Sequence, residues 1–239
     1  MNIVSTTDLR RVYGEGETAV HALRGVTVGF PTGQFAAIMG PSGSGKSTLM
    51  HLLAGLDKPT SGSVVVDGQE LANLDDAALT RLRRDKLGFV FQAFNLLPVL
   101  SAEENILLPL TLAGRKPDRE WWNRLIDTVG LRDRLTHRPS ELSGGQQQRV
   151  AVARALVHRP AVVFADEPTG NLDSRSSEEV LGLLRHAVDD FEQTVIMVTH
   201  DPQAAAVADR IVLLRDGEVV HDGPAKDTED VLDLMRATA

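Results

Sequence analysis

A segment in the first quarter of the chain has the residue types and spacing of a phosphate-binding loop. It contains the pattern G-x-x-x-x-G-K-[ST], in the residues Gly40, Pro41, Ser42, Gly43, Ser44, Gly45, Lys46, Ser47 and Thr48. Glycines let backbone N–H groups close around a phosphate, and the start of a following helix adds partial positive charge. We expect Lys46 to reach the β- and γ-phosphates of a nucleoside triphosphate and the Ser47 hydroxyl to hold Mg²⁺. The other interpretation is a glycine-rich turn that binds nothing.

Two carboxylates follow an apolar segment later in the chain. Asp166 and Glu167 come directly after Ala161–Ala165, a continuous apolar run typical of a parallel strand buried on both faces. The ligand crevice of an open parallel sheet lies at the carboxyl ends of its strands. There Asp166 can hold Mg²⁺, and Glu167 can orient or deprotonate the water that attacks a γ-phosphate. A solvated loop start is the alternative.

Gln92 and His200 occupy similar positions after predicted strands. Gln92 follows Leu87–Phe91, and His200 follows Thr194–Thr199. A single histidine or glutamine is as easily structural as functional, and its place beside the crevice leaves both interpretations open.

A second glycine-rich segment, Leu142–Arg149, precedes a predicted helix over Val150–Val157. Ser143 and Gln146 satisfy a capping box, which is a sufficient structural reason for both residues. Yet Gly144 and Gly145 expose N–H groups at a helix start, which suits a further phosphate contact. Because the chain already contains one complete phosphate loop, this segment indicates either another nucleotide or another subunit.

Local patterns predict the elements that position these residues. The loop lies between a strand over Phe35–Met39 and a helix over Leu49–Ala54. Further strands and turns are predicted at Gly25–Phe30, Ser63–Val66, Asp67-Gly68, Ile211–Leu214, Asp216-Gly217 and Glu218–Val220. Helices are predicted from the Ser101/Glu104 capping box through Leu112, over Arg119–Val129, and over Ser176–Phe191. Trp121 and Trp122 are expected to pack rather than to stack on a ligand. The order of elements predicts an α/β ATPase core with a helical insertion near residues 95–158.

Composition limits the classes of partner. The 25 Lys and Arg residues against 33 Asp and Glu give a net charge of −8, which argues against a broad nucleic-acid surface. Without cysteines there can be no disulfide or thiolate metal site. No stretch approaches the ~18 apolar residues of a membrane span. Residues 1–8 lack the basic and apolar regions of a secretory signal.

The segment Leu142–Gln146 resembles the signature sequence of the ATP-binding cassette (ABC) family. The phosphate loop, Gln92, the signature, Asp166-Glu167, Asn171-Leu172-Asp173 and His200 also follow one another in that family's order. The resemblance covers essentially the whole chain. It implies a P-loop NTPase (RecA-like) core with an N-terminal antiparallel β subdomain and an inserted α-helical subdomain. We expect a single domain over 1–239, with the core at about 1–94 and 159–239 and the helical subdomain at about 95–158.

The resemblance also implies roles for individual residues. Tyr13 matches the aromatic residue that stacks on adenine. Gln92 matches the glutamine that touches Mg²⁺ and the attacking water, and Asp173 matches a loop that communicates across a dimer. Glu167 matches the catalytic base and His200 a γ-phosphate contact. Ser143, Gly144, Gly145 and Gln146 match the signature that acts on ATP bound to the opposite subunit. Two ATP molecules, each with Mg²⁺, would thus lie between two head-to-tail subunits of a homodimer.

Three segments are similar to ATPases of the macrolide-exporter and lipoprotein-release type: Tyr13–Leu23, Phe91–Pro98 and Ala165–Asp173. The resemblance implies a cytoplasmic ATPase that lies at the inner face of the membrane through a separately encoded permease. It would drive export or transmit mechanical motion. The alternatives are a regulatory ATPase similar to the cell-division subunit that controls cell-wall hydrolases, and a soluble ATPase of DNA repair or translation.

Overall fold

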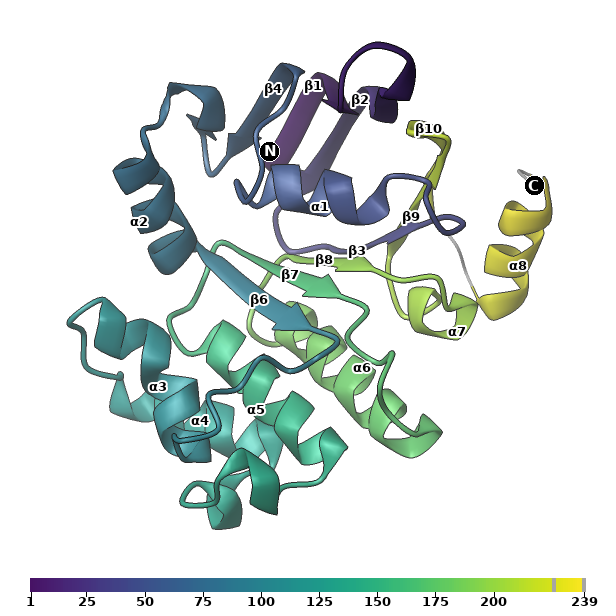
Figure 1. Ribbon diagram of the computed structural model, residues 1–239. Coiled ribbons are helices and arrows are strands. Elements are labelled where there is room, and N and C mark those ends of the chain that lie inside the picture. Colours follow the sequence, from purple (N-terminus) through teal and green to yellow (C-terminus); the bar gives the residue numbers. More distant parts are fainter. Residues whose placement is uncertain (225–226, 238–239) are drawn as a thin grey trace.

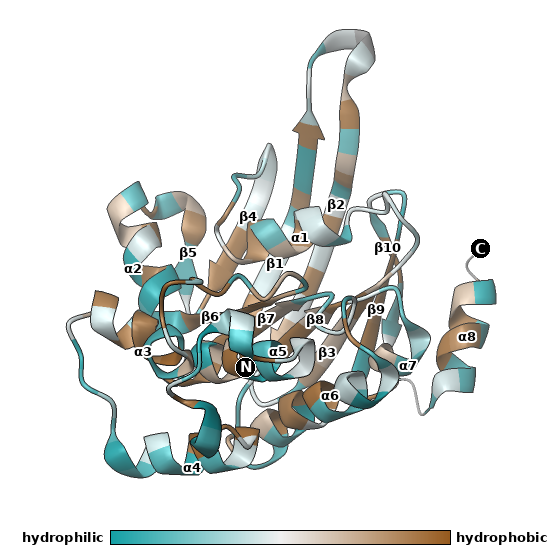
Figure 2. Cartoon of the chain, turned by 60° about the horizontal axis from the view of Figure 1, so that its bottom comes forward, coloured by the Kyte–Doolittle hydropathy of each residue, from teal (hydrophilic) through white to brown (hydrophobic). Residues whose placement is uncertain are grey.

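An antiparallel sheet forms the N-terminal part of the protein in the computed structural model, which describes residues 1–224 and 227–237 (Figure 1). Its strands, in the order β2-β1-β4-β5, are β1 (Asn2–Tyr13), β2 (Val20–Pro31), β4 (Ser61–Val66) and β5 (Gln69–Glu70). The predicted Asp67-Gly68 turn joins β4 to β5, and both residues have positive φ (47° and 74°), as the favoured hairpin turn requires. The far end of the β1–β2 hairpin extends away from the rest of the molecule (Figure 2).

A six-stranded sheet forms the centre, in the order β10-β9-β3-β8-β7-β6. Its strands are β3 (Phe35–Met39), β6 (Leu87–Phe91), β7 (Val162–Asp166), β8 (Val195–Val198), β9 (Arg210–Arg215) and β10 (Glu218–Gly223). All neighbours pair in parallel except β9 and β10, which form the predicted closing hairpin. This arrangement confirms the α/β class with an antiparallel β region and a parallel core.

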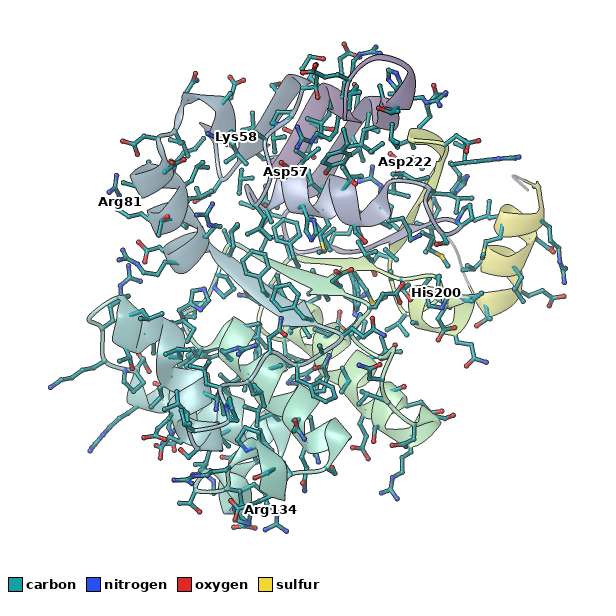
Figure 3. The ribbon with its side chains drawn as sticks, viewed as in Figure 1. Asp57, Lys58, Arg81, Arg134, His200 and Asp222 are labelled. Atoms are coloured by element: carbon teal, nitrogen blue, oxygen red, sulfur yellow. The ribbon has the colours of Figure 1, made fainter. Side chains whose placement is uncertain are left out.

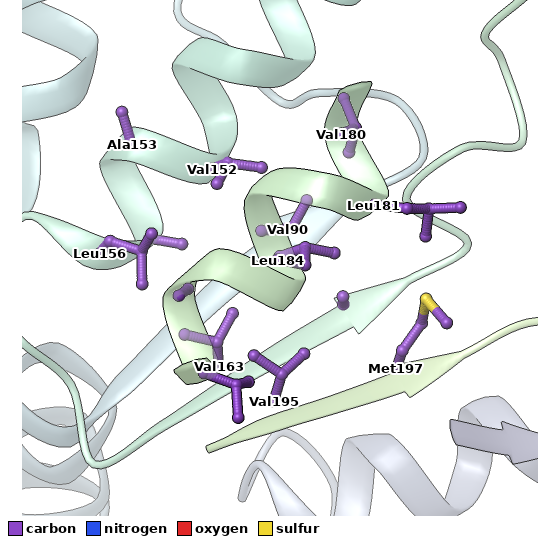
Figure 4. Close-up of a cluster of buried hydrophobic side chains, with 14 of the residues drawn as sticks. Val90, Val152, Ala153, Leu156, Val163, Val180, Leu181, Leu184, Val195 and Met197 are labelled. Carbon is purple, nitrogen blue, oxygen red and sulfur yellow. The ribbon is translucent and has the colours of Figure 1, made fainter. Parts of the chain in front are cut away.

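The alternation of side chains along the central strands divides the core into two layers. Ala36 and Ile38 of β3 face the layer that contains α1 and the antiparallel sheet. Phe35, Ala37 and Met39 face the layer that contains the other helices. Figure 4 shows part of this second layer, where side chains of α5 and α6 pack on those of β7 and β8. Because both faces are covered, the inner strands β3, β7 and β8 are apolar and buried along almost their whole length.

The helices confirm most of the predicted elements. They are α1 (Lys46–Leu53), α2 (Asp76–Lys86), α3 (Ala102–Leu112), α4 (Arg119–Val129), α5 (Gly144–Leu156), α6 (Ser174–Asp189), α7 (Pro202–Ala205) and α8 (Thr228–Ala237). Short 3-10 turns cover Gly16–Thr18, Leu71–Asn73, Arg132–Arg134 and Pro139–Glu141. The predicted start of α5 at Val150 is wrong, because Ser143 caps the helix and both signature glycines are its first residues. Among the described helices, none has the length and apolar character needed to cross a bilayer.

Helices α3, α4 and α5 lie together on one side of the central sheet (Figure 1). As predicted, Trp121 packs: it is buried and its indole N–H donates to the Val157 carbonyl (3.1 Å), whereas Trp122 is only partly buried. Residues of α3–α5 share one apolar layer with β7 and α6. The boundary of a helical subdomain at residues 95 and 158 therefore stays a prediction.

Candidate functional site

The central sheet brings four of the predicted motifs to one edge. The phosphate loop follows β3, His200 comes two residues after β8, Asp166 ends β7, and Gln92 follows β6. These strands are consecutive neighbours in the order β3-β8-β7-β6. Adjacent strands lie about 4.8 Å apart, so the carboxyl ends form one continuous row. The parallel sheet thus gathers residues that are up to 160 positions apart in sequence.

The backbone at each of the three glycines of the phosphate loop has a positive φ, which only glycine adopts readily. Gly40 (φ 145°) begins the loop and Gly45 (φ 100°) caps α1. The Lys46 ammonium is buried and donates to the carbonyls of Gly40 (2.9 Å) and Pro41 (2.8 Å). Burial lowers the pKa of Lys46, while the carboxylates of Glu167 and Asp166 oppose that shift. The ammonium is therefore held at the mouth of the loop, with acidic groups on its other side.

Glu167 is fixed by two neighbours and by an unusual backbone conformation. Its Oε1 lies 2.8 Å from Nδ1 of His200, and its Oε2 accepts a hydrogen bond from Thr199 Oγ1 (3.3 Å). Its φ is +46°, in the left-handed region that non-glycine residues rarely occupy and that recurs at functional sites. His200 lies beyond the end of β8 because the chain turns there into α7, with Asp201 N donating to Thr199 Oγ1. The pair predicted from sequence is thus in direct contact.

The oxygen donors near the loop fit a Mg²⁺ ion. Burial, reinforced by Glu167, raises the pKa of Asp166, and His51 and Lys46 oppose this rise. A partly buried carboxylate of this kind gains from a nearby cation. Ser47 and Gln92 are exposed and offer neutral oxygens, and the buried Ser44 hydroxyl has no hydrogen-bond partner. Within the described residues no three His, Asp or Glu side chains cluster, so phosphate oxygens would have to complete the site.

Gln92 is connected to the loop after β7. Its Nε2 donates to Asn171 Oδ1 (3.2 Å), and Asn171 Nδ2 donates back to the Gln92 carbonyl (3.0 Å). A side chain at Gly170 would collide with Gln92, so this close approach requires glycine there. Gln92 therefore moves with the segment that connects Glu167 to Asp173.

A cavity of about 970 Å³ opens beside the Glu167–His200 pair. Residues of α6 and α7, including Ser177, Arg185 and Gln203, make up half of its lining. Figure 3 labels His200, which lies beside α7. Of the described residues that line the cavity, none belongs to Ser143–Gln146.

The signature segment forms a self-contained helix start. Ser143 Oγ accepts from Gln146 N (3.2 Å), and Gln146 Oε1 accepts from Ser143 N (2.9 Å), which confirms the capping box. A Cβ at Gly145 would lie 2.6 Å from Ser176 Oγ, so the first turn of α5 packs tightly on α6. Asp173 caps α6 and accepts from Ser176 N (3.0 Å) and Oγ (2.7 Å), which lowers the pKa of Asp173. The structure therefore brings Asp173 to the signature.

Tyr13 has partners that the sequence interpretation missed. Its hydroxyl donates to Asp57 Oδ2 (2.7 Å), and the Arg11 guanidinium lies over its ring (4.3 Å to the centroid) while pairing with the same Asp57 (2.9 Å). One ring face is covered by Arg11, and the side chain is 39% exposed.

The family comparison agrees with this geometry. The family model described as ABC transporter matches residues 23–170. The macrolide export ATP-binding/permease protein MacB of Marinobacter nauticus is 49% identical over 226 residues, which cover 94% of this chain and 35% of that protein. MacB of Escherichia coli K12 is also 49% identical, over 93% of this chain and 35% of the relative. The chain thus spans about a third of the length of these relatives.

Solved structures extend the comparison to the fold. The dimeric ATP-binding cassette MJ0796 in a post-hydrolysis state with ADP and Pi has a TM-score of 0.82 and 43% identity, covering 92% of this chain and 98% of that one. The cassette cbiO1 of Clostridium perfringens has a TM-score of 0.83 and 28% identity, covering 97% and 91% of the two chains.

A phosphate loop at the edge of a parallel sheet, with partly buried acidic residues beside it, defines a P-loop ATPase. Since the family model covers more than half of the chain and the relatives are nearly half identical, this chain belongs to the ABC transporter family. It is an ATP-binding cassette ATPase.

Proposed function

We propose that this cassette is the ATP-hydrolysing part of an exporter or mechanotransmission system and works as a head-to-tail dimer around two ATP molecules. The observation that carries the proposal is the separation of two phosphate-binding elements within one chain. The phosphate loop follows β3, whereas α5, which begins with the signature glycines, packs on β6, and strands β8 and β7 lie between these two strands. A second copy can supply a signature to each nucleotide site, and the MJ0796 structure is described as dimeric.

Within one site, each residue has a distinct proposed task. Lys46 exchanges its contacts with the Gly40 and Pro41 carbonyls for phosphate oxygens, and Tyr13 offers one free ring face to adenine. Glu167 accepts the proton of the attacking water, and His200, which contacts Glu167, also faces the γ-phosphate. When bound, Mg²⁺ neutralises developing phosphate charge, and Ser47, Gln92 and Asp166 are the oxygen donors that would hold it.

Between the two copies, Ser143, Gly144, Gly145 and Gln146 of one chain contact the ATP of the other, and Asp173 lies at the same surface. The Gly144 and Gly145 N–H groups make no hydrogen bond to any described residue, so they are free to receive phosphate oxygens. A γ-phosphate recognised by both copies favours the closed dimer, and its loss on hydrolysis removes that bridge.

An apolar groove supports coupling to a membrane permease. It has a volume of about 360 Å³ and lies between β6 and α3, where Phe89, Phe91, Leu108 and Leu112 line it. Leu112 is 69% exposed and the groove begins next to Gln92, so a docked segment would touch the loop that carries this residue. Such docking would place the cassette at the cytoplasmic face of the inner membrane. Whether the permease is separately encoded stays a prediction, since the MacB relatives are named ATP-binding/permease proteins.

Mixing two inactive variants tests the head-to-tail dimer. Lys46→Ala should abolish phosphate binding, and Ser143→Ala should weaken the signature, so each chain alone hydrolyses little ATP. In a mixed dimer the intact loop of the Ser143→Ala chain faces the intact signature of the Lys46→Ala chain. We expect phosphate release to rise on mixing. Mixed dimers that are detected by cross-linking but show no single-turnover hydrolysis would contradict the proposal.

A further inference from the structure

The loop after β6 contains two consecutive non-glycine residues in the left-handed region. Phe94 has a φ of +60° and Asn95 a φ of +51°. Such conformations are uncommon for side chains with a Cβ, and two in succession persist only where surrounding groups hold them. They follow Gln92 by two and three residues, so they form the turn on the C-terminal side of Gln92, while β6 and Asn171 hold its other contacts.

Besides two backbone hydrogen bonds within the loop, Phe94 N to the Phe91 carbonyl (3.1 Å) and Asn95 N to the Ala93 carbonyl (2.6 Å), Arg154 on the third turn of α5 holds this turn from outside it. Its Nη1 donates to the Asn95 carbonyl (2.6 Å) and its Nη2 to the Phe94 carbonyl (2.8 Å). The planar guanidinium presents two parallel donors in a fixed fork, which matches two adjacent carbonyls. Both left-handed residues are therefore fixed by one side chain from the signature helix.

Arg154 has no acidic partner in the part of the chain that the structure describes. Its side chain is partly buried, and burial alone lowers the pKa of its guanidinium. Arginine stays charged under these conditions, so the two carbonyl dipoles must compensate for lost hydration. Because burying the Arg154 guanidinium costs hydration free energy, this side chain depends on its two carbonyl partners more strictly than an arginine in a surface ion pair depends on its own.

Two further contacts join the same loop to α5. A Cβ at Gly144 would lie 3.8 Å from Phe94 Cζ, so the Phe94 ring reaches the signature glycine. Gln148 Nε2 donates to the carbonyls of Phe91 (3.2 Å) and Pro168, which belong to the segments carrying Gln92 and Glu167. The loop is thus attached to α5 at the helix start, in its second turn and at Arg154.

We propose that Arg154 is a positioning residue that holds the Phe94–Asn95 turn in its left-handed conformation and thereby fixes Gln92 relative to the signature helix. This inference rests on the proposed role of Gln92 beside the γ-phosphate. A displacement of α5 when its signature meets the opposite ATP is then passed to Gln92 of its own chain. Arg154 also lines the apolar groove between β6 and α3, so this groove is part of the same connection between α5 and Gln92.

The test is steady-state ATP hydrolysis by the full chain carrying Arg154→Lys. Lysine keeps the charge but offers a point donor in place of a fork, so the turn loosens while the fold is retained. We expect kcat to fall by about tenfold, within the ~10²-fold range that a misplaced group can cost, while KM for ATP changes little. Arg124→Lys is the matched control, because Arg124 also donates to a backbone carbonyl, that of Asp190, far from the loop.

Relief of the strained backbone provides a rescue. Asn95→Gly removes the penalty for positive φ, since glycine adopts this region freely. In the Arg154→Lys chain it should restore most of the lost kcat. A purely structural role for Arg154 predicts instead a lower melting temperature in Arg154→Lys with kcat and KM unchanged, or a loss that Asn95→Gly leaves in place. Either result would overturn the proposal.

A double-mutant cycle separates this inference from the proposed function. If Arg154 acts through Gln92, Arg154→Lys should lower kcat only slightly in a Gln92→Ala chain. A full additional loss in that background would refute the positioning role while leaving Gln92 at the site. If Gln92→Ala alone leaves kcat unchanged, the role of Gln92 fails, and the positioning proposal fails with it.

Discussion

The edge of the central sheet and the start of α5 both suit phosphate, yet they are built in opposite ways. At the sheet edge, Lys46 is buried and Asp166 partly buried, and burial shifts the pKa of each toward the neutral form. At the start of α5 no charged side chain is present between Ser143 and Gln148, and the capping box satisfies the local polar side chains.

This difference in charge and burial indicates which region is suited to catalysis and which one is suited to completing a nucleotide site. Groups with shifted pKa values beside a phosphate loop are suited to proton transfer and metal binding. A helix start whose first two N–H groups have no hydrogen-bond partner among the described residues can bind an anion without changing its protonation state. The comparison therefore supports our proposal that the reaction takes place at the sheet edge and that the signature recognises the second nucleotide.

The largest expected effect is loss of turnover at the sheet edge. Glu167→Gln keeps the shape of the side chain but removes the base, so hydrolysis should fall by ~10²–10⁴-fold. Binding of ATP should persist, and phosphate release measured beside nucleotide binding separates the two. Glu178→Gln, from the same cavity, is the control and should be nearly neutral. Steady-state hydrolysis retained by Glu167→Gln would remove the assigned role and weaken the comparison.

A smaller effect is expected at the signature. Gly145→Ala adds a Cβ that would meet Ser176 Oγ at 2.6 Å, so the first turn of α5 must shift. We expect a clear loss of hydrolysis with unchanged affinity of the isolated chain for ATP, measured by equilibrium binding. Gly182→Ala, a helical position with open space around its Cβ, is the control. If Gly145→Ala weakened ATP binding to the monomer, the two regions would not be functionally separate.

The smallest effect concerns stability. Because burial raises the pKa of Asp166 in the folded state, its stabilising contribution is present below the ordinary aspartate pKa of about 3.9 and is lost as pH rises through the raised value. At neutral pH, without nucleotide or Mg²⁺, Asp166→Asn should therefore raise the melting temperature by a few degrees, a change of ~2–4 °C per kcal/mol at this size. The gain should shrink on acidification. A lower melting temperature at pH 7 would show that the Asp166 charge stabilises the free protein.

Most of the fold could be predicted because its signals are local. Strand β6 and helix α4 have the predicted bounds, since an apolar run and the Asp118 and Gly130 caps define them within a few residues. Helix α2 was not predicted: apart from its Ala and Leu residues it is polar, and among its residues only Leu79 and Leu82 are buried. Its stability comes from packing that leaves little periodicity in the sequence.

The candidate site likewise contains residues that the sequence located and residues that it missed. Motif spacing located Lys46, Glu167, His200 and the Ser143–Gln146 cap, because each depends on its neighbours along the chain. Asp57, which holds Tyr13, was missed, since it lies 44 positions away and only the antiparallel pairing of β1 with β4 brings it near. Arg154 was missed because its partners are main-chain carbonyls, which every residue has and no motif records.

The sequence by itself determined the strands, the caps and the order of the phosphate-binding motifs, because hydrophobic period and capping act over a few residues. Only the tertiary structure decided that the sheet edge and the signature are separate regions, and that Arg154 joins the signature helix to the loop of Gln92. Strand order and the direction of a backbone carbonyl result from packing over the whole chain. They leave no pattern in the residues that they connect.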